Sequence, residues 1–299
     1  MSSTIHYTQC PCCHSPQIRF VLEAKDHTVS QESFPVWECT ACSLRFTQDV
    51  PDAASIGPYY QSEDYISHSN TSKGLVNRLY QLVRKRTLRS KRKQVQRETG
   101  IRQGTLLDVG SGTGAFLREM KEHGWDCTGL EPDAGARKVA KDLFGVELQG
   151  STALFTLPEG HFQAITLWHV LEHVHDLHAY LDKLRKLLAP GGRIFIAVPN
   201  YTAGDARVYG AHWAAYDVPR HLYHFTPDAI RQLASQHGME LLRMKPMWYD
   251  SFYISLLSSK YKYGQTRLFS AFVNGLRSNL GAWGNTRRCS SVIYVLGGA

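Results

Sequence analysis

Two C-x₂-C pairs in the first fifty residues have the spacing of a metal site. Each C-x₂-C turn presents two thiolates to one ion, and zinc prefers four such ligands in a tetrahedron. The predicted ligands are Cys10, Cys13, Cys39 and Cys42. We therefore predict structural Zn²⁺ in a zinc ribbon, whose short strands come from the runs IRFVLEA and FPVWE. Cys12 and His14 lie beside the first pair, and either could replace a neighbour as a ligand.

A second pattern, HVLEH at residues 169–173, matches the H-x-x-E-H signature of inverted zinc peptidases. A peptidase needs both histidines one turn apart on a continuous helix. The preceding AITLW run is β-branched and aromatic, which predicts a strand, and the next helix is expected to begin near Asp176. His169 and His173 should therefore flank a strand-to-helix transition, and this places the zinc in the cysteines instead.

The stretch LLDVGSGTGAF follows an apolar run and precedes a helical pattern. Glycines at 110, 112 and 114 let the backbone approach a ligand, whose anionic group can lie at the helix N-terminus. Glu131 ends the next predicted strand, where a carboxylate can bind a ribose diol. The same glycine spacing occurs in dinucleotide-binding enzymes, so the glycines alone do not identify the cofactor.

Asp108, two residues before the first glycine, separates the two cofactor classes. A carboxylate there would repel a pyrophosphate. S-Adenosylmethionine (SAM) carries an ammonium and a sulfonium, which the same carboxylate would attract. The loop therefore favours SAM, although a tight strand–helix turn without a ligand is the simplest alternative.

These residues need a sheet to position them, and strand-like and helix-like runs alternate from Ile101 onward. The chain has 43% hydrophobic and 20% charged residues, which is typical of a soluble globular protein. We expect three parts: a zinc-ribbon domain at 1–50, a linker loop with a basic amphipathic helix at 51–100, and an α/β domain at 101–299. The aromatic and histidine-rich insertion at 201–225 has the composition of a substrate lid.

The motifs LLDVGSGTG, GLEPD, LWHVLEHVHD and LLAPGGRIFIAVPN follow one another from about residue 100. In order and spacing they resemble the class I SAM-dependent methyltransferases, and within that family the ubiquinone-biosynthesis-like small-molecule group. A zinc ribbon ahead of this domain is also similar to the sugar C-methyltransferases of antibiotic pathways. The resemblance implies a Rossmann-like sheet of seven strands with helices on both faces, and SAM as cofactor.

The resemblance implies that the glycine loop lines the methionine moiety, that Glu131 binds the ribose, and that Ser151 and Thr152 lie near the adenine. The predicted cofactor contacts are Asp108, Gly110, Ser111, Gly112, Gly114, Glu131, Pro132, Ser151, Thr152, Trp168 and His169.

Methyl transfer requires a base only if the acceptor carries a proton of high pKa. The candidates are His221 and His224 in the insertion, and His169 at a strand end. The predicted substrate contacts are Tyr60, Tyr65, Trp213, Arg220 and Tyr223. For any one of these histidines a structural, hydrogen-bonded role is the stronger alternative. Arg220 could form a plain ion pair, and the tyrosines could only pack the linker onto the domain.

The formal charge of +8 is concentrated in residues 73–98, which hold ten Lys or Arg and one Glu. Such a run is usually the solvated face of a helix docked by its apolar stripe. An anionic membrane surface, an acidic carrier protein or RNA are the partners it could serve. With no signal-peptide pattern and no apolar run of transmembrane length, we expect a cytoplasmic protein, with peripheral membrane attachment as the alternative.

The sequence thus predicts a SAM-dependent methyltransferase acting on oxygen or carbon of a small-molecule acceptor, free, lipid-linked or carrier-tethered. The alternatives are an RNA or protein methyltransferase that uses the zinc ribbon and basic helix for binding, and a SAM-binding module without catalysis.

Overall fold

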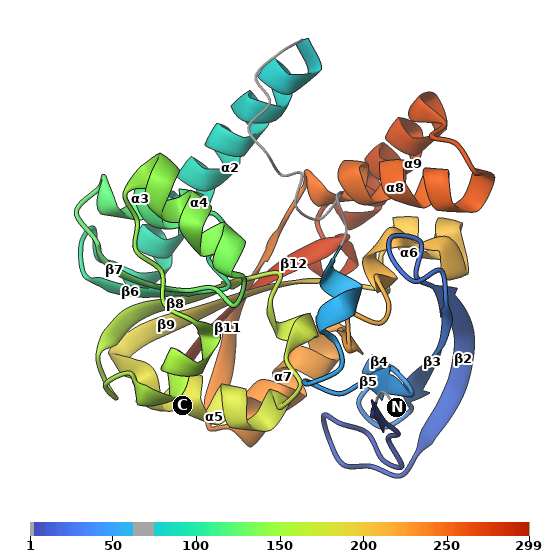
Figure 1. Cartoon of the computed structure of the whole chain (residues 1–299), viewed down its shortest axis with the longest axis horizontal. Coiled ribbons are helices and arrows are strands. Elements are labelled where there is room, and N and C mark those ends of the chain that lie inside the picture. The colour runs from blue at the N-terminus through green and yellow to red at the C-terminus, as the bar shows by residue number, and fades with distance from the viewer. Residues whose placement is uncertain (1–2, 62–74, 299) are drawn as a thin grey trace.

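A computed structural model describes residues 3–61 and 75–298, and its centre is a six-stranded sheet (Figure 1). The strand order is β11-β12-β9-β8-β6-β7. The bounds are β6 Thr105–Val109, β7 Asp126–Leu130, β8 Phe162–Trp168, β9 Leu188–Pro199, β11 Met239–Pro246 and β12 Ser291–Gly298. Strands β6 to β9 pair in parallel, whereas β12 is antiparallel to both of its neighbours. This is an α/β Rossmann-like sheet with the expected reversed edge.

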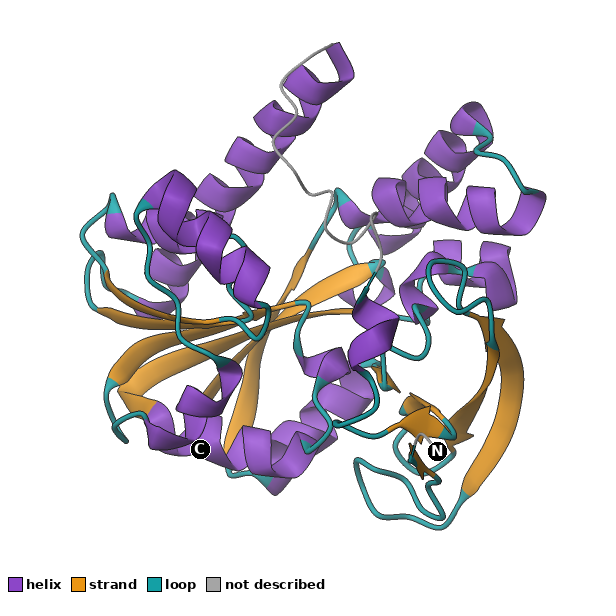
Figure 2. Ribbon diagram, in the orientation of Figure 1, coloured by secondary structure: helices purple, strands orange, loops and turns teal. Residues whose placement is uncertain are grey.

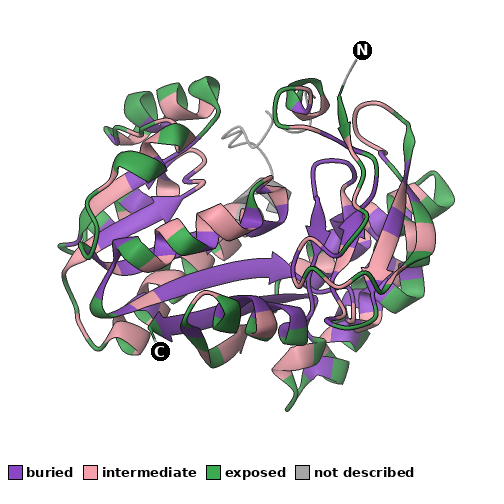
Figure 3. Cartoon of the chain, turned by 90° about the horizontal axis from the view of Figure 1, so that it is seen from below, coloured by how far each residue is buried: buried purple, intermediate pink, exposed green. Residues whose placement is uncertain are grey.

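The sheet has one strand fewer than the predicted seven. The run VELQG at 146–150 forms only an isolated parallel bridge, between Gln149 and Leu130. Val146 is buried and Leu148 packs against the core, but the backbone of the run pairs with β7 only through Gln149. Figure 3 shows that the strands themselves form the buried centre of the domain.

Helices cover both faces of the sheet (Figure 2). One face carries α2 Leu75–Thr99, α3 Ala115–Lys121 and α4 Ala134–Phe144; the other carries α5 Leu177–Leu187 and α7 Pro227–Gln236. In α5, Leu177, Leu181, Leu184 and Leu187 recur at helical spacing and all are buried. Asp176 caps this helix as predicted, because its side chain accepts a hydrogen bond from the Ala179 N–H at 3.0 Å.

The N-terminal part forms a second small sheet with strand order β10-β4-β3-β2. Its strands are β2 Ile18–Lys25, β3 Ser33–Cys39, β4 Arg45–Thr47 and β10 Tyr223–His224; β1 Thr4–Ile5 pairs separately with β5 Val50–Pro51. Because β10 belongs to the 201–225 insertion, that insertion completes the N-terminal sheet. The two parts also share one hydrophobic core. The domain boundaries at residues 50 and 100 remain predictions.

The insertion contains α6 Gly204–Tyr209, two short 3₁₀ turns (Gly210–His212 and Ala214–Tyr216) and strand β10. Most of the insertion is buried. Beyond β11, two further helices form a hairpin: α8 Asp250–Tyr263 and α9 Leu268–Ala282. Sequence analysis predicts neither of them. Within the part of the chain that the structure describes, no helix is both long and apolar enough to cross a membrane.

Candidate active site

The glycine loop joins β6 to α3 at the carboxyl edge of the sheet, and its backbone needs glycine. Gly110 has φ of +70° and Gly112 has φ of +53°, a region that side chains with a Cβ adopt only under strain. A Cβ at Gly110 would lie 2.4 Å from the Val170 side chain, whereas one at Gly112 would meet nothing within 4 Å. Gly112 therefore leaves open space beside the loop, which a ligand can occupy.

Glu131 follows β7 and closes the loop from the neighbouring strand. Its Oε2 accepts from the Gly112 N–H at 2.8 Å, and its Oε1 accepts from the Asp133 N–H at 3.0 Å. Burial raises the pKa of Glu131, against these hydrogen bonds. The Glu131 N–H donates to Gln149 O at 2.9 Å, which brings the chain just before Ser151 and Thr152 beside it. The predicted adenine-proximal segment thus lies next to the predicted ribose ligand, while Pro132 is exposed.

A cation lies near the start of this loop. The Lys91 Nζ of α2 is 4.2 Å from the centroid of the Trp168 ring. Burial lowers the pKa of Lys91 to about 8, although the charges of Asp250 and Asp108 oppose the change. Burial also raises the pKa of Asp108 to about 6, against a 2.6 Å hydrogen bond from the Thr166 hydroxyl. The indole N–H of Trp168 is buried without a hydrogen-bond partner.

His169 follows directly after β8 and is held between two carboxylates. Its φ is +59°, which turns the chain sharply at the end of the strand. Nε2 lies 3.1 Å from Asp250 Oδ2, and Nδ1 lies 3.4 Å from Glu172 Oε1. Burial alone would lower the pKa of His169, but the two carboxylates raise it to about 9. About a third of the side chain, 34%, is exposed, so the ring can be reached from outside.

Glu172 is buried and neither of its oxygens has a hydrogen-bond partner. Together with His173 and His221 it forms a group whose donor atoms lie within 4.8 Å of one another, close enough to share a cation. His173 and His221 also touch edge to face, with centroids 4.6 Å apart. His173 belongs to the 3₁₀ turn Leu171–His173, so His169 and His173 do not share a continuous helix, as predicted. The distant His221 joins them, although no sequence pattern links it to Glu172 and His173.

Comparison with known proteins assigns this chain to a family. A model of the methyltransferase domain family matches residues 79–243, more than half of the chain. The chain belongs to this family and to the class I SAM-dependent methyltransferases. It is 33% identical over 130 residues to a ubiquinone biosynthesis O-methyltransferase of Xanthomonas oryzae, covering 40% of this chain and 54% of the relative. The chain thus spans about half the length of that relative.

An uncharacterised methyltransferase of Geobacillus kaustophilus is 32% identical over 146 residues, covering 44% of this methyltransferase and 67% of the relative. Among solved structures, the 1,6-didemethyltoxoflavin N1-methyltransferase of Burkholderia thailandensis, with bound 1,6-didemethyltoxoflavin and S-adenosylhomocysteine, aligns with a TM-score of 0.45 and 15% identity. That alignment covers 71% of this chain and 78% of the other.

The residues at the sheet edge fit SAM, the cofactor of this family. Open space beside Gly112, the Glu131 carboxylate and an unpaired indole N–H on Trp168 are all present. The Trp168 ring already contacts one cation, the ammonium of Lys91, and the charges of Asp108 and Asp250 favour its protonated form. A cationic cofactor therefore suits this environment electrostatically. All the individual cofactor contacts predicted from the sequence, from Asp108 to His169, remain predictions.

Lys91 and SAM would place two positive charges in one environment. We expect Lys91→Met to lower the Kd for SAM by about tenfold, because it removes this repulsion. Since Lys91 loses its proton above its pKa of about 8, SAM binding to the wild type should also tighten as pH rises from 7 to 9. Isothermal titration checks both. Lys93→Met, on an exposed position of the same helix, is the control, and equal or weaker binding by Lys91→Met would refute the repulsion.

The four predicted zinc ligands come together in the N-terminal part. Cys10 and Cys42 have sulfurs 3.5 Å apart, as do Cys13 and Cys39, and all four lie within 4.8 Å of one another. Tetrahedral zinc with Zn–S bonds of about 2.3 Å sets sulfurs about 3.8 Å apart, so the cluster fits structural Zn²⁺.

Neither of the two alternative ligands belongs to this cysteine cluster. The Cys12 thiol points to the Ala229 carbonyl, 3.9 Å away in α7, and the His14 ring stacks on His178 of α5 with centroids 4.8 Å apart. The zinc site therefore packs, through these two neighbouring residues, against helices α7 and α5.

Removing zinc should destabilise the whole chain rather than an independent module, because the cluster packs on α5 and α7. We expect Cys39→Ser, or prolonged chelation, to lower the melting temperature by roughly 5–10 °C in a single transition. Cys127→Ser, which changes a half-buried thiol of β7 outside the cluster, is the control. A stoichiometry of one zinc per chain by elemental analysis should accompany the wild type; a metal-free chain of unchanged stability would contradict the assignment.

The predicted bases of the insertion are buried in structural contacts. His224 lies in β10, with Nε2 3.3 Å from the Thr47 hydroxyl and its ring edge-on to Tyr216. Burial holds the pKa of His224 well below its usual value, so the ring is neutral. His221 Nδ1 lies 2.9 Å from Ala215 O. As bases, both remain predictions.

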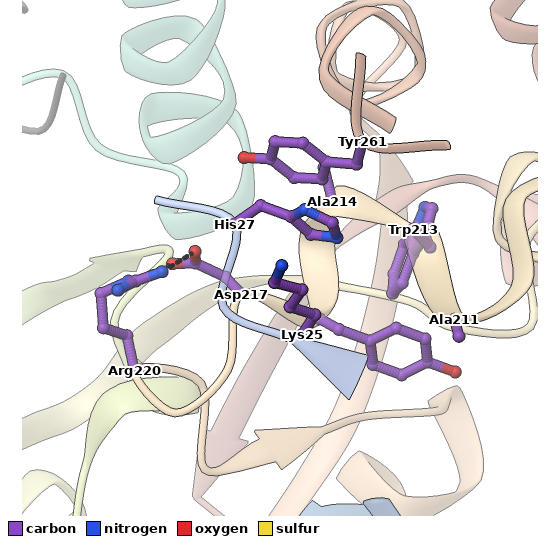
Figure 4. A pocket seen from close by; sticks show the side chains of 9 residues that line it. Lys25, His27, Ala211, Trp213, Ala214, Asp217, Arg220 and Tyr261 are labelled. Carbon is purple, nitrogen blue, oxygen red and sulfur yellow. Dashed lines mark hydrogen bonds and ion pairs between the residues drawn. The ribbon is translucent and has the colours of Figure 1, made fainter. Parts of the chain in front are cut away.

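The insertion residues predicted to bind substrate are also buried. Trp213 donates to Asp205 at 2.9 Å, and the Tyr223 hydroxyl donates to His175 O at 3.1 Å. Arg220 forms ion pairs with Asp26 at 3.0 Å and Asp217 at 2.6 Å. Figure 4 shows the last pair, with Arg220 beside a small cavity between the insertion, Lys25 and His27 of the N-terminal part, and Tyr261 of α8. Their substrate roles remain predictions.

Of the two linker tyrosines predicted to contact the substrate, only Tyr60 lies within the described residues. The Tyr60 hydroxyl lies 3.0 Å from Nδ1 of His173, next to the Glu172 group. Tyr65 lies outside the described residues. Tyr60 therefore brings the linker to the edge of the candidate site, where a substrate contact remains a prediction.

Proposed function

We propose that this methyltransferase transfers a methyl group from SAM to the hydroxyl oxygen of a small phenol-like acceptor. The observation that carries the proposal is His169, held between Asp250 and Glu172 at the end of β8. Its pKa of about 9 lies close to that of a phenol, about 10, so proton transfer between the two is nearly balanced. The similarity to ubiquinone biosynthesis O-methyltransferases supports oxygen as the acceptor atom.

Bound SAM would supply a methyl carbon attached to a cationic sulfur, which keeps the electron pair of the broken bond. The protein's part is to orient the acceptor hydroxyl and to remove its proton. We assign the arriving proton to Nε2 of His169, because Nδ1 faces the buried Glu172, whose oxygens lack another donor, and therefore keeps its own hydrogen. Asp250 faces Nε2, and both carboxylates stabilise the imidazolium that forms.

The test follows methyl-labelled SAM into acceptors of different classes. We expect label in the methyl ether of a phenol or catechol, and little in an amine, RNA or protein. Glu131→Ala should raise the KM for SAM by about 10- to 100-fold, because it removes the charge-assisted hydrogen bonds proposed between this carboxylate and the ribose of SAM. Glu122→Ala, which changes an exposed carboxylate of the neighbouring helix end, is the control. Label that enters only RNA or protein, or a Glu131→Ala enzyme with unchanged KM, would contradict the proposal.

A further inference from the structure

Helix α9 exposes its large apolar side chains and buries its small ones. The buried positions are Ala271, Gly275, Ser278 and Ala282. The exposed ones are Leu268, Phe269, Phe272, Leu276, Leu280 and Trp283, the last directly after the helix. Phe269 and Trp283 are 82% and 80% exposed. A helix docked on a protein core normally has the opposite arrangement.

The small face exists because α8 and α9 pack closely. A Cβ at Gly275 would lie 3.1 Å from the Cα of Phe252 and 2.9 Å from its ring, so only glycine fits there. Helix α8 contributes small buried residues too, the serines at 251, 255, 258 and 259. Packing through small residues, as in helix pairs within lipid, leaves the outer face free for an apolar surrounding.

The charge around this hairpin indicates what that surrounding is. Residues 251–299 contain six Lys or Arg and no Asp or Glu. Lys260, Lys262, Arg267 and Arg277 are exposed around the hairpin. Since residues 73–98 carry +9 and residues 251–299 carry +6 of a total of +8, the remaining chain carries −7. In Figure 1 the N-terminal end of α2 and the α8–α9 hairpin project from the same side of the molecule.

We propose that the α8–α9 hairpin binds the surface of an anionic lipid bilayer, with the apolar face of α9 entering the headgroup region and the surrounding cations contacting lipid phosphates. A basic, aromatic-rich apolar face without acids has the composition of an interfacial helix. A second copy of the chain is a poorer occupant, because face-to-face pairing would bring two rims of like charge together. The surface is separate from the proposed methyl transfer and does not depend on it.

Vesicle flotation tests this with the full chain. Wild type should float with vesicles of equal parts phosphatidylcholine and phosphatidylglycerol but not with phosphatidylcholine alone. Phe269→Ser with Trp283→Ser should weaken vesicle binding by more than about tenfold, through lost apolar burial. Arg267→Gln with Arg277→Gln should weaken it by about tenfold at low salt. The matched control, Val139→Ser with Leu143→Ser, removes two exposed apolar residues of α4 and should bind like wild type.

Thermal melting of each variant shows that the fold is retained, and sedimentation velocity without lipid gives the oligomeric state. Absent binding of wild type to anionic vesicles would overturn the proposal, as would undiminished binding of the Phe269/Trp283 variant. A wild-type dimer that the same variant converts to monomers would overturn it too, since a second copy would then cover the face.

Discussion

Replacing His169 by asparagine should lower kcat by about 10²- to 10⁴-fold while leaving the Kd for SAM within about threefold of the wild-type value. Asparagine is the substitution of choice because His169 has φ of +59°, a conformation that asparagine tolerates better than most residues. The loss follows from removing the group that takes the acceptor proton. Stopped assays with labelled SAM give kcat, and isothermal titration gives the Kd.

The pH dependence distinguishes a base from a merely structural histidine. With its pKa raised to about 9 by the two carboxylates, His169 is mostly protonated at pH 7, and only about 1% is ready to accept a proton. The wild-type rate should therefore rise nearly tenfold per pH unit from 7 and level off near 9. The His169→Asn rate should lack this His169-dependent rise. A variant that keeps both the rate and the slope would show that the base lies elsewhere, with His221 and His224 the next to test.

Arg220→Ala should destabilise the fold by about 3–5 kcal/mol, the second large effect we expect. Arg220 is 2% exposed, pairs with Asp26 and Asp217, and donates to Tyr59 O at 2.8 Å. It thereby joins the N-terminal sheet, the linker and the insertion. Removing the guanidinium leaves the fully buried Asp26 carboxylate without its counter-charge. Urea unfolding measures the loss.

The control for this prediction is Arg231→Ala, which breaks a solvent-exposed pair with Asp228 and should cost less than about 1 kcal/mol. The two carboxylates that pair with Arg220 determine how the stability changes with pH. Arg220 keeps the pKa of Asp26 and Asp217 below the usual value, so their contribution to stability is present above about pH 4 and lost as pH falls below it. Equal losses in Arg220→Ala and Arg231→Ala would contradict the buried network.

Much of the fold could be predicted because it depends on local patterns. Apolar runs that alternate with helical patterns predicted β6, β8 and β9. Glycines at 110, 112 and 114 predicted the loop, whose backbone conformation requires them. Each C-x₂-C turn is itself local, and the antiparallel pairing of β2 with β3 brings the two turns together. The prediction of a seventh strand was wrong, since a short apolar run such as VELQG can pack its side chains into the core without pairing its backbone as a strand.

The charged contacts of the site could not be predicted, because they join residues that lie far apart in the sequence. Asp250 reaches His169 from the start of α8, a helix that our sequence analysis missed because its apolar residues have no clear one-sided pattern. Lys91 was counted as part of a solvated basic face. Its spacing from Leu88 and Val95, which pack against the sheet, could have placed it on the inner stripe of α2.

The most direct test of the account is a SAM titration of the wild type and Gly112→Val by calorimetry. The loop should bind one SAM per chain, and valine at 112 should weaken binding by at least about tenfold, because its side chain fills the open space beside the loop and its φ of +53° disfavours a branched residue. Gly57→Ala, in an open position with ordinary backbone, should bind as wild type does. Failure of wild type to bind SAM, or equal affinity in Gly112→Val, would contradict the assignment of this loop as the cofactor site.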